Sequence, residues 1–553
     1  MADYMNRFVD SSTFAMRYFV FFIIILTNKA LAQNTTVHAL EYDNTAALQT
    51  AFNEPSNIYV VIKSKMRIAG RVTIPAGKII KFEPGGMLTG EGFLKGGIID
   101  AGYHHQIFDT AFNIEPQGVQ NYFSAKWFGA TGGGRDDYTA IQKSITTCIL
   151  NNIRTLFIPA GRYSISKPLI LQGKIDSANK SRTRAFCTLE ILGESSFWDS
   201  NMGTEIYPSF NNTFAIGIQT GKGCKIRKLK VVGLFKPPFL NDLKKFYNSS
   251  FSEFTDRQCR DSRYSPYAAI VIDPFTNLIN DPMPDDGGYP GLSAFYGQAN
   301  NLQSLSGSTA TELEELSING FVVGICSSPN GVSKNAEITL INKVQFENCK
   351  LAISGGQAQE KMNRVTNIAC WGGTHTIFAT GLYGSEKEAG NWYISHANIA
   401  GGVVRFIYND QKGYFPLYIN AIYAESIGSW GTINSDIATE ISNSVIDFAD
   451  VEIAGERNLL TSWGKNVLYK NCNFRFYGKS TPILMEGNCT FENCFFSGKL
   501  QQSSAGRFSL KNVLADPFDK RSLVSIIIFL SVVTAMLLAV LIFVFIKRRR
   551  INR

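Results

Sequence analysis

The sequence predicts an all-β fold, a single elongated right-handed parallel β-helix, from two main observations. The segments 344–349, 467–472 and 489–494 each place an aromatic residue two positions before an Asn-Cys pair, and Asn471 and Asn493 are 22 residues apart. Such a spacing is about one coil of a β-solenoid. The composition agrees, because only 18% of the residues are charged and Gly and Phe are plentiful, as is typical of a protein with many short strands.

The physical reason for such repeats is that a short strand cannot bury an apolar face alone. Coils therefore stack, and like residues lie on like residues. We expect the repeated Asn to form a ladder of side-chain amides at a turn, and Cys and aromatic residues to fill the inner column. The segments 224–233 and 311–320 carry the same alternation without the Asn-Cys ending.

A second repeat lies nearer the front of the chain. The segment 72–77 reads Val-Thr-Ile-Pro-Ala-Gly and recurs at 156–161 as Leu-Phe-Ile-Pro-Ala-Gly. Each reads as a strand that enters a Pro-Ala-Gly turn. We expect a small β-rich unit over residues 37–115, followed by the β-helix over residues 120–515.

The opening of the β-helix carries a resemblance to a known family. Residues 127–142 read Trp-Phe-Gly-Ala-Thr-Gly-Gly-Gly-Arg-Asp-Asp-Tyr-Thr-Ala-Ile-Gln, and residues 158–163 read Ile-Pro-Ala-Gly-Arg-Tyr. Together they resemble the start of the pectate-lyase-like (rhamnogalacturonase- and epimerase-like) β-helix superfamily. The chain departs from that pattern at 132–134, where three glycines stand in place of the frequent Gly-Asp-Gly. The resemblance covers about 120–500 and implies the fold, with almost no information on the substrate.

The same residues also predict a capping helix. Asp136 or Asp137 can cap a helix in which Ile141, Ile145 and Ile149 recur on one face. This helix would cover the open end of the solenoid and hide its unpaired strand edge.

The N-terminus predicts a signal peptide over residues 1–32. Arg17 precedes an apolar run from Tyr18 to Leu26, and Ala-Leu-Ala at 30–32 offers small residues for cleavage. Met16 is the more ordinary start for such a signal. We expect the mature chain to begin at Gln33.

The C-terminus predicts one transmembrane helix over residues 523–546. This stretch is apolar apart from two serines and one threonine, and the tail at 547–553 is strongly basic. The positive-inside rule therefore places this tail in the cytoplasm. The expected location is the cell membrane, as a single-pass protein with the β-helix body outside the cytoplasm.

The net charge of +9 does not indicate a nucleic-acid partner. Residues 1–32 contribute +1 and residues 520–553 contribute +7, which leaves +1 for the body. Basicity is a property of the two ends, so no nucleic acid is expected as a partner.

All ten cysteines lie in the body, and none forms a Cys-x-x-Cys pair. A structural zinc site is therefore not expected. Because several cysteines stand in apolar strand patterns, we expect mostly free, buried thiols, with room for one or two disulfides.

The segment 235–305 is too long for a simple turn, which favours a function there. Its aromatic residues are interleaved with Arg and Asp, a mixture that suits carbohydrate. The candidate substrate-binding residues in it are Arg260, Arg263, Tyr264, Tyr267 and Tyr289. An ordered surface loop with internal ion pairs explains the same composition equally well.

A glycoside hydrolase needs two carboxylates that flank the scissile bond. The candidate acids are Asp273, Asp285, Asp286 and Glu425. The adjacent pair at 285–286 is similar to the paired acids of polygalacturonases. The rest of that family's pattern, Asn-Thr-Asp, Gly-His-Gly and Arg-Ile-Lys, is missing from this chain.

A polysaccharide lyase instead needs a base beside a uronate carboxylate that Arg, Lys or Ca²⁺ neutralises. Lys361 and His375 are the candidate catalytic residues, and Arg364 and Tyr383 are candidates for binding the substrate. His396 is notable only because histidine is scarce in this chain. We expect no cofactor and no metal, except Ca²⁺ if the enzyme is a lyase.

These observations lead to one hypothesis and one alternative. The chain is predicted to act on a polysaccharide at the cell surface, as a polysaccharide lyase or a glycoside hydrolase. The alternative is a non-catalytic glycan-binding or adhesive surface protein, because solenoids present long, regular faces.

Overall fold

The computed structural model describes the following residues: 33–37, 43–172, 187–196, 203–219, 221–236, 267–274, 308–327, 337–355, 362–374, 376–380, 391–400, 405–409, 417–427, 429–433, 439–448, 452–453, 456–457, 462–476, 483–497, 500–502 and 508–515. The predicted signal peptide and transmembrane helix lie outside these residues. Within them, no helix is long and apolar enough to cross a membrane.

The chain divides into two compact units. Among the described residues, unit 1 comprises those within 33–210 and 218–230, and unit 2 comprises those within 211–217, 231–274 and 308–515. The strands β16 (Ile216–Gln219) and β18 (Lys230–Val232) fall on the boundaries between them.

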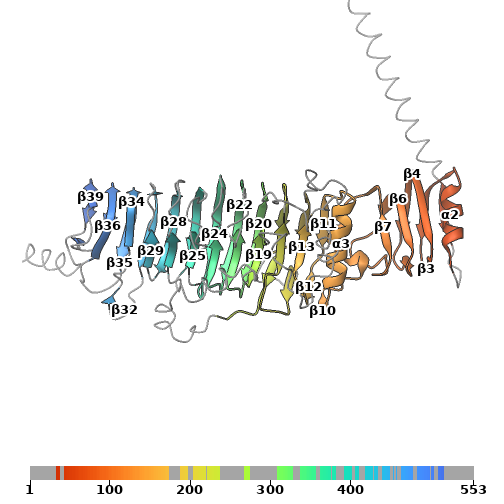
Figure 1. Ribbon diagram of the computed structural model, residues 1–553, viewed down its shortest axis with the longest axis horizontal. Coiled ribbons are helices and arrows are strands. Elements are labelled where there is room, and N and C mark those ends of the chain that lie inside the picture. The colour runs from red at the N-terminus through yellow and green to blue at the C-terminus, as the bar shows by residue number, and fades with distance from the viewer. Residues whose placement is uncertain are drawn as a thin grey trace, which may run out of the picture. The chain divides into compact units, whose positions relative to one another are not determined.

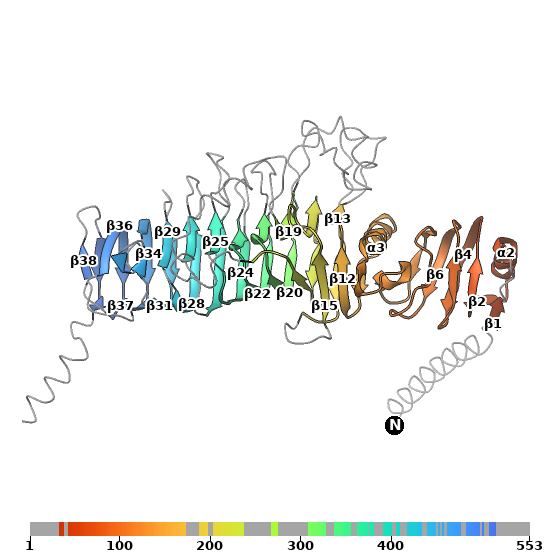
Figure 2. The same ribbon diagram turned by 90° about the horizontal axis from the view of Figure 1, so that it is seen from below.

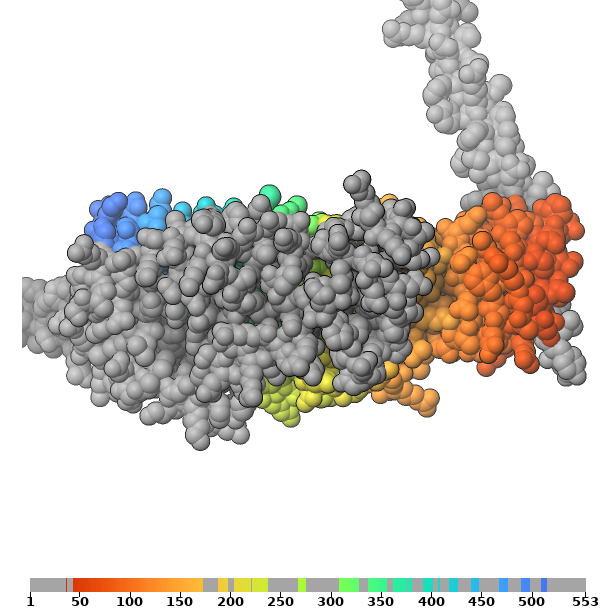
Figure 3. Space-filling model, viewed as in Figure 1, coloured from red at the N-terminus to blue at the C-terminus, as the bar shows by residue number. Residues whose placement is uncertain are grey.

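The front of unit 1 is a parallel sheet in the order β1-β2-β4-β6-β7, with β8 also paired to β6. The short strands β3 and β5 form a second parallel pair. The space-filling view shows this part, red to orange, as one packed block (Figure 3). Its elements are β1 (Gln33–Val37), α2 (Thr45–Asn53), β2 (Asn57–Ile62), β3 (Lys65–Arg67), β4 (Arg71–Phe82), β5 (Met87–Thr89), β6 (Phe93–Asp100), β7 (Asn113–Glu115) and β8 (Gly118–Val119).

The rest of unit 1 contains two parallel ladders of strands, β9-β11-β14-β17 and β10-β12-β15 (Figure 1). Parallel pairing of strands this far apart in sequence is the pairing of stacked coils. The elements are β9 (Phe123–Ser124), η1 (Ala125–Phe128), β10 (Gly133–Asp136), α3 (Tyr138–Leu150), β11 (Thr155–Ile158), β12 (Gly161–Ile165), β13 (Leu169–Gln172), β14 (Glu190–Gly193), β15 (Thr204–Pro208) and β17 (Lys225–Arg227).

Helix α3 lies where the sequence predicts a helix, and Ile141 and Ile145 are buried on its inner face. Its N-cap residue is Asp137, but the Asp137 carboxylate does not bond to the helix. It accepts hydrogen bonds from the Thr131 and Gly132 N–H groups instead, at 2.6 and 3.0 Å. The carboxylate that accepts the first helical N–H, from Tyr138 at 3.1 Å, is that of Asp136. Asp137 therefore stabilises the glycine-rich turn, and Asp136 accepts the first N–H of the helix.

Unit 2 is a stack of coils with one long ladder, drawn from green to blue (Figures 1 and 2). All strand pairs of this long ladder are parallel, and most are in register. Its strands are β20 (Glu312–Asn319), β22 (Leu340–Glu347), β24 (Asn363–Cys370), β26 (Trp392–Ile399), β28 (Leu417–Ile427), β30 (Thr439–Ser442), β31 (Val445–Phe448), β34 (Ser462–Lys470), β35 (Asn473–Phe476), β36 (Ile483–Glu492), β37 (Phe495–Phe496), β39 (Phe508–Lys511) and β40 (Leu514–Ala515).

A second parallel ladder runs through the first coils of unit 2. It consists of β19 (Ala268–Ile272), β21 (Val323–Ser327), β23 (Leu351–Ser354), β25 (Thr376–Thr380), β27 (Arg405–Asn409) and β29 (Ser429–Ile433). The strand β38 (Leu500–Gln502) pairs with β36, and β32 (Glu452–Ile453) and β33 (Glu456–Arg457) form a small antiparallel pair. Coils that repeat strand upon strand in parallel confirm the predicted parallel β-helix.

The inner columns of unit 2 contain the residues that the repeats predict. The rings of Tyr469 and Phe491 stack with their centroids 4.7 Å apart, and Phe474 and Phe496 stack at 4.9 Å. All nine cysteines among the described residues are free and buried, which confirms the prediction of buried thiols for them. Cys259 lies outside the described residues.

The predicted asparagine ladder is present for the repeats at 467–472 and 489–494, whereas Asn348 of the first repeat lies at another turn, where its amide donates to the Asn319 side-chain oxygen at 3.3 Å. The side-chain amide of Asn471 donates to the side-chain oxygen of Asn443 at 3.2 Å, and that of Asn493 donates to Asn471 at 3.3 Å. Asn512 continues the ladder to Asn493 at 3.3 Å. These asparagines have positive φ angles, between 50° and 54°. Asparagine tolerates this backbone conformation better than most residues, which explains its repetition at the turn.

Candidate functional site

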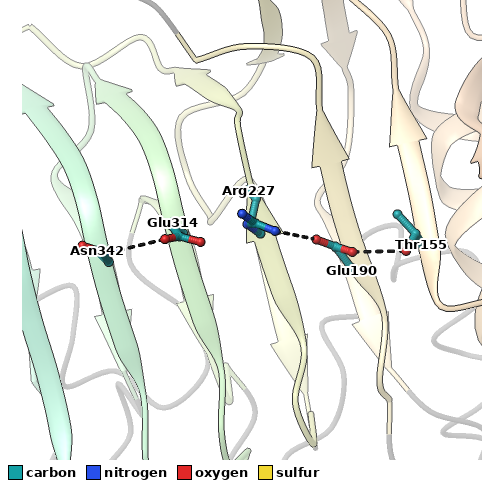
Figure 4. Close-up of polar contacts among 5 residues, drawn as sticks. All are labelled: Thr155, Glu190, Arg227, Glu314 and Asn342. Atoms are coloured by element: carbon teal, nitrogen blue, oxygen red, sulfur yellow. Dashed lines mark hydrogen bonds and ion pairs between the residues drawn. The ribbon is translucent and has the colours of Figure 1, made fainter.

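The outward side chains of the β-helix coils mostly satisfy one another. In unit 1, Glu190 accepts a hydrogen bond from the Thr155 hydroxyl at 3.1 Å and forms an ion pair with Arg227 at 3.3 Å (Figure 4). In unit 2, the Asn342 amide donates to the Glu314 carboxylate at 2.8 Å (Figure 4). Such ladders stabilise the stack and leave few free groups. A polar or aromatic side chain that remains exposed and unpaired is therefore a candidate for binding a ligand.

One row of unit 2 carries such side chains. Arg364 of β24, Tyr393 of β26, Tyr418 of β28 and Glu440 of β30 occupy paired positions on successive strands. We call these four residues the tyrosine row. Neighbouring strands lie about 4.8 Å apart, so the row extends about 14 Å along the stack.

The two tyrosines of the row are stacked and face solvent. Their ring centroids are 4.9 Å apart and their planes differ by 6°. Tyr393 is 39% exposed and Tyr418 is 37% exposed, while the residues that flank Tyr393 in its strand, Trp392 and Ile394, are buried. Because side chains alternate between the two faces of a strand, burial of the neighbours directs both rings outward.

Arg364 adds a positive charge at one end of the row. Its side chain is exposed, and no described residue forms an ion pair or hydrogen bond with its guanidinium. The backbone N–H of Arg364 donates to the Thr339 carbonyl at 2.8 Å, which fixes the strand beneath it. A free guanidinium beside an aromatic pair can bind a carboxylate or a hydroxyl while the rings contact an apolar surface.

Glu425, a predicted catalytic acid, lies on the same strand as Tyr418. It is exposed, and its carboxylate accepts a hydrogen bond from the Tyr423 hydroxyl at 3.0 Å. Tyr423 is the paired neighbour of Asn398 on β26. A third exposed tyrosine therefore lies in the coil that contains Tyr418.

Asp273, another predicted acid, is buried directly after β19. Its carboxylate accepts two hydrogen bonds from Ser308, one from the backbone N–H and one from the hydroxyl, both at 2.6 Å. Asp273 also has a positive φ of 52°, which is uncommon for a residue other than glycine. The Asp273 side chain thus joins the two ends of the segment 274–307. Its role as a catalytic acid stays a prediction.

Tyr267, a predicted substrate-binding residue, is buried just before β19. Its hydroxyl accepts a hydrogen bond from the Leu234 N–H at 2.7 Å, and its ring lies 4.9 Å from that of Phe321. Tyr267 and Leu234 flank the segment 235–266, so this bond joins its two ends. Contact of Tyr267 with a substrate stays a prediction.

The remaining predicted site residues lie outside the described residues. Among the described residues, the structure brings together Arg364 and two tyrosines that were not predicted. It places Tyr267 and Asp273 at opposite ends of β19. The predicted residues outside the description are Arg260, Arg263, Tyr264, Asp285, Asp286, Tyr289, Lys361, His375 and Tyr383.

Tyr393 and Tyr418 could have been found from the sequence by aligning coils. Trp392-Tyr393-Ile394 and Leu417-Tyr418-Ile419 are 25 residues apart, and each places a tyrosine between two large apolar residues. In an alternating strand that pattern directs the tyrosine outward. The spacing is close to one coil, which stacks the two rings.

In the described part of the chain, no group of three His, Cys, Asp or Glu side chains is placed to hold a metal ion. The described residues thus provide no cluster that fits Ca²⁺, which prefers six to eight oxygen ligands.

No protein-family model matches this chain, and no curated protein sequence matches it. Several solved structures are similar in part. The Agl-KA catalytic domain is 13% identical, with 72% of this chain and 65% of that chain covered and a TM-score of 0.42. A tailspike protein mutant of E. coli bacteriophage HK620, in complex with a hexasaccharide, is 10% identical, with coverages of 69% and 62% and a TM-score of 0.37.

The A-module of the Azotobacter vinelandii mannuronan C-5 epimerase is 11% identical, with coverages of 72% and 98% and a TM-score of 0.32. The matched part of this chain spans less than two thirds of the length of the first two structures. At these identities and TM-scores, none of the three assigns an activity to this chain. The parallel β-helix rests on the strand pairings of the chain itself.

Proposed function

We propose that this protein acts on a polysaccharide at the cell surface, as a polysaccharide lyase or a glycoside hydrolase of the pectate-lyase-like kind. The observation that carries the proposal is the tyrosine row, with its exposed, stacked Tyr393 and Tyr418 beside the exposed Arg364. Aromatic side chains combine an apolar body with a polar tip, which suits a sugar that presents C–H groups and hydroxyls together.

The direction of the row suits a polymer. Equivalent positions recur about every 4.8 Å along the stack, so a chain that lies along the stack meets a new side chain at each coil. Arg364 would bind a carboxylate or hydroxyl at one end of the row, and Glu440 would accept hydrogen bonds from sugar hydroxyls at the other.

The reaction would need groups beyond the row. In a hydrolase, two of the acids Asp285, Asp286, Glu425 and Asp273 would flank the scissile bond. In a lyase, Lys361 or His375 would remove the proton beside a uronate carboxylate that Arg364 neutralises. No step through Ca²⁺ is proposed, because the described residues include no cluster that fits the ion.

We propose further that the body is exported by the signal peptide at 1–32 and anchored by the helix at 523–546. The length and apolar character of 523–546, together with the basic tail at 547–553, support this arrangement. The β-helix over 120–515 and the small unit over 37–115 would then stand outside the cytoplasm.

Helix α3 is proposed to cap an edge of the stack. The Gln142 side chain supports this role, because it donates to the Ile170 carbonyl at 3.0 Å and accepts from the Ile170 N–H at 2.8 Å. Both backbone groups of a residue in β13 are thereby satisfied by the helix, as protection of an edge strand requires.

The test uses the full chain in detergent micelles with a panel of acidic and neutral polysaccharides. New ultraviolet absorbance from unsaturated uronate ends identifies a lyase, and new reducing ends without it identify a hydrolase. The variant Tyr393→Ala/Tyr418→Ala is expected to bind the preferred polymer at least about tenfold more weakly, because both stacking rings are lost. Tyr122→Ala, at an exposed tyrosine of unit 1, is the matched control. Parent-like binding by the double variant contradicts the proposal.

Binding without catalysis is the second candidate. It is favoured by the engagement of the two described acids, Asp273 with Ser308 and Glu425 with Tyr423. Binding that depends on the two tyrosines, with neither new product from any polymer, would identify a glycan-binding or adhesive protein.

A further inference from the structure

The last described coil of unit 2 exposes two leucines. Leu510 in β39 is 47% exposed and Leu514 in β40 is 71% exposed. Leu510 is the paired neighbour of Phe491, which is fully buried one coil earlier. The inner apolar column therefore continues into this coil and becomes accessible there.

The core beneath Leu510 is aromatic, because Phe491 contacts Phe474 and Phe496 with ring centroids 6.2 and 5.2 Å apart. Leu514 is the paired neighbour of the half-buried Phe495, next to this column. The last coil thus ends the column with an apolar surface. Exposed apolar surface of this kind commonly marks a site of interaction.

The sequence that follows limits what can cover this surface. Seven residues, 516–522, separate the last described residue from the apolar stretch at 523–546. Seven extended residues span at most about 25 Å. If 523–546 crosses the membrane, residue 515, next to Leu514, is therefore held within about 30 Å of the hydrocarbon layer.

The charges near the leucines favour the same partner. Lys511 is exposed beside Leu510, and Lys520 and Arg521 lie just before the apolar stretch. Lysine and arginine near a membrane are attracted to anionic headgroups, while leucines enter the boundary with the acyl chains. Between two copies of this coil, by contrast, the same basic groups would face one another and repel.

We propose that the surface formed by Leu510, Lys511 and Leu514 docks on the membrane in which residues 523–546 lie. This inference rests on the anchoring part of the proposed function and is independent of the polysaccharide. The tether makes docking an intramolecular event, so a small apolar surface is sufficient. Docking covers the end of the aromatic column and holds the last coil against the bilayer.

The experiment places the full chain in nanodiscs of phosphatidylcholine and phosphatidylglycerol, with or without bromine on the acyl chains. Leu514→Trp introduces a reporter at the proposed surface, and the signal of the six native tryptophans is subtracted with the parent chain. Leu234→Trp, at a residue of unit 2 that is 41% exposed outside the last coil, is the matched control. Quenching by brominated lipid is expected to be at least about twofold greater at position 514 than at position 234, because only position 514 would meet acyl chains.

A second variant separates docking from chance proximity. Adding Leu510→Asp to the Leu514→Trp chain is expected to lower the quenching to the level of the control, since a carboxylate opposes insertion. Equal quenching at 514 and 234 overturns the proposal, and so does a concentration-dependent dimer that buries Leu514 away from lipid. Failure of the chain to enter the nanodiscs would instead overturn the proposed anchor, so the two failures are distinguishable.

Discussion

Two stretches of coils in unit 2 make the same backbone bend with different residues. In each coil, one residue of the long ladder has a φ angle between 50° and 55°. In the first stretch these residues are Glu315, Lys343, Asn367, His396 and Ala421, and in the second they are Asn443, Asn471, Asn493 and Asn512.

Every coil of the second stretch has asparagine at the bend. Its asparagines tolerate the left-handed conformation, and their amides donate to one another from coil to coil. In the first stretch only Asn367 is an asparagine, and its amide donates to the Asn342 side-chain oxygen at 2.9 Å. The other four side chains accept a cost of about 1–2 kcal/mol at each left-handed position. Lys343 and Glu315 offset part of this cost with an exposed ion pair at 3.3 Å.

The difference coincides with the position of the tyrosine row. Tyr393 and Tyr418 lie on strands that make the bend with His396 and Ala421, whereas the strand of Arg364 makes it with Asn367. Local rules are often broken where a protein has a function and kept where it needs only stability. We infer that the coils with asparagine at the bend serve mainly to stabilise the stack, and that the coils with other residues there carry the face to test.

The largest effect is expected from Asn471→Ala in the second stretch. The change removes two amide hydrogen bonds of the ladder and places alanine in a left-handed conformation. We expect the free energy of unfolding to fall by about 3 kcal/mol, measured by urea unfolding with circular dichroism. Asn398→Ala, at an exposed asparagine of β26 with an ordinary φ, is the control and should change stability by less than about 0.5 kcal/mol. Equal effects of the two substitutions would remove the distinction between the stretches.

The second prediction concerns the buried thiols, which both stretches contain. Burial raises the pKa of Cys349 to about 12 and that of Cys489 to about 12. A thiol with a raised pKa in the folded state contributes stability that is complete below its unfolded pKa, near 9. This contribution is lost as the pH rises from there toward the folded pKa, because the unfolded chain then releases its proton more readily.

The prediction is a steeper alkaline loss of stability in the parent than in Cys349→Ser. Between pH 8 and pH 10 the difference should reach about 1.4 kcal/mol, which is the value of one pKa unit. Urea unfolding at pH 8, 9 and 10 measures it, and Cys489→Ser should give a change of similar size in the second stretch. A parallel pH dependence in parent and variants would show that these thiols do not titrate with a raised pKa.

The sequence was sufficient for the supporting parts of the fold and insufficient for the site. The asparagine ladder and the buried thiols could be predicted because 471–472 and 493–494 repeat the same pair one coil apart. When a local pattern recurs one coil later, the repeated residues lie next to each other in neighbouring coils. The hydrogen bonds of Asp273 with Ser308 join residues 35 positions apart, and no local pattern encodes that closure. The two tyrosines of the row escaped prediction because they lie outside the Asn-Cys repeats, and the register of β26 on β28 is what brings their rings together.

The third prediction extends the regular stretch into the irregular one. Ala421→Asn places asparagine at a left-handed position one coil before Asn443. We expect a gain of about 1 kcal/mol, because asparagine relieves the backbone strain at this position. Ala369→Asn, at a partly exposed alanine of β24 with an ordinary φ, is the control and should be neutral or slightly destabilising. A loss of stability at position 421 would show that the bend there is held by something other than its side chain.

The smallest effect on stability is expected in the tyrosine row itself. Tyr418→Ala removes a stacked cross-strand pair on the solvent face, which is worth about 0.5–1 kcal/mol. Because both rings are more than a third exposed, little apolar surface leaves the core. If the row serves the polysaccharide, this small loss should accompany about a tenfold weaker binding of the preferred polymer. Tyr418→Phe, which keeps the ring, should retain most of the binding. A large loss of stability with unchanged binding would instead assign the tyrosines to support, and the first stretch would then differ from the second only in how it makes its bends.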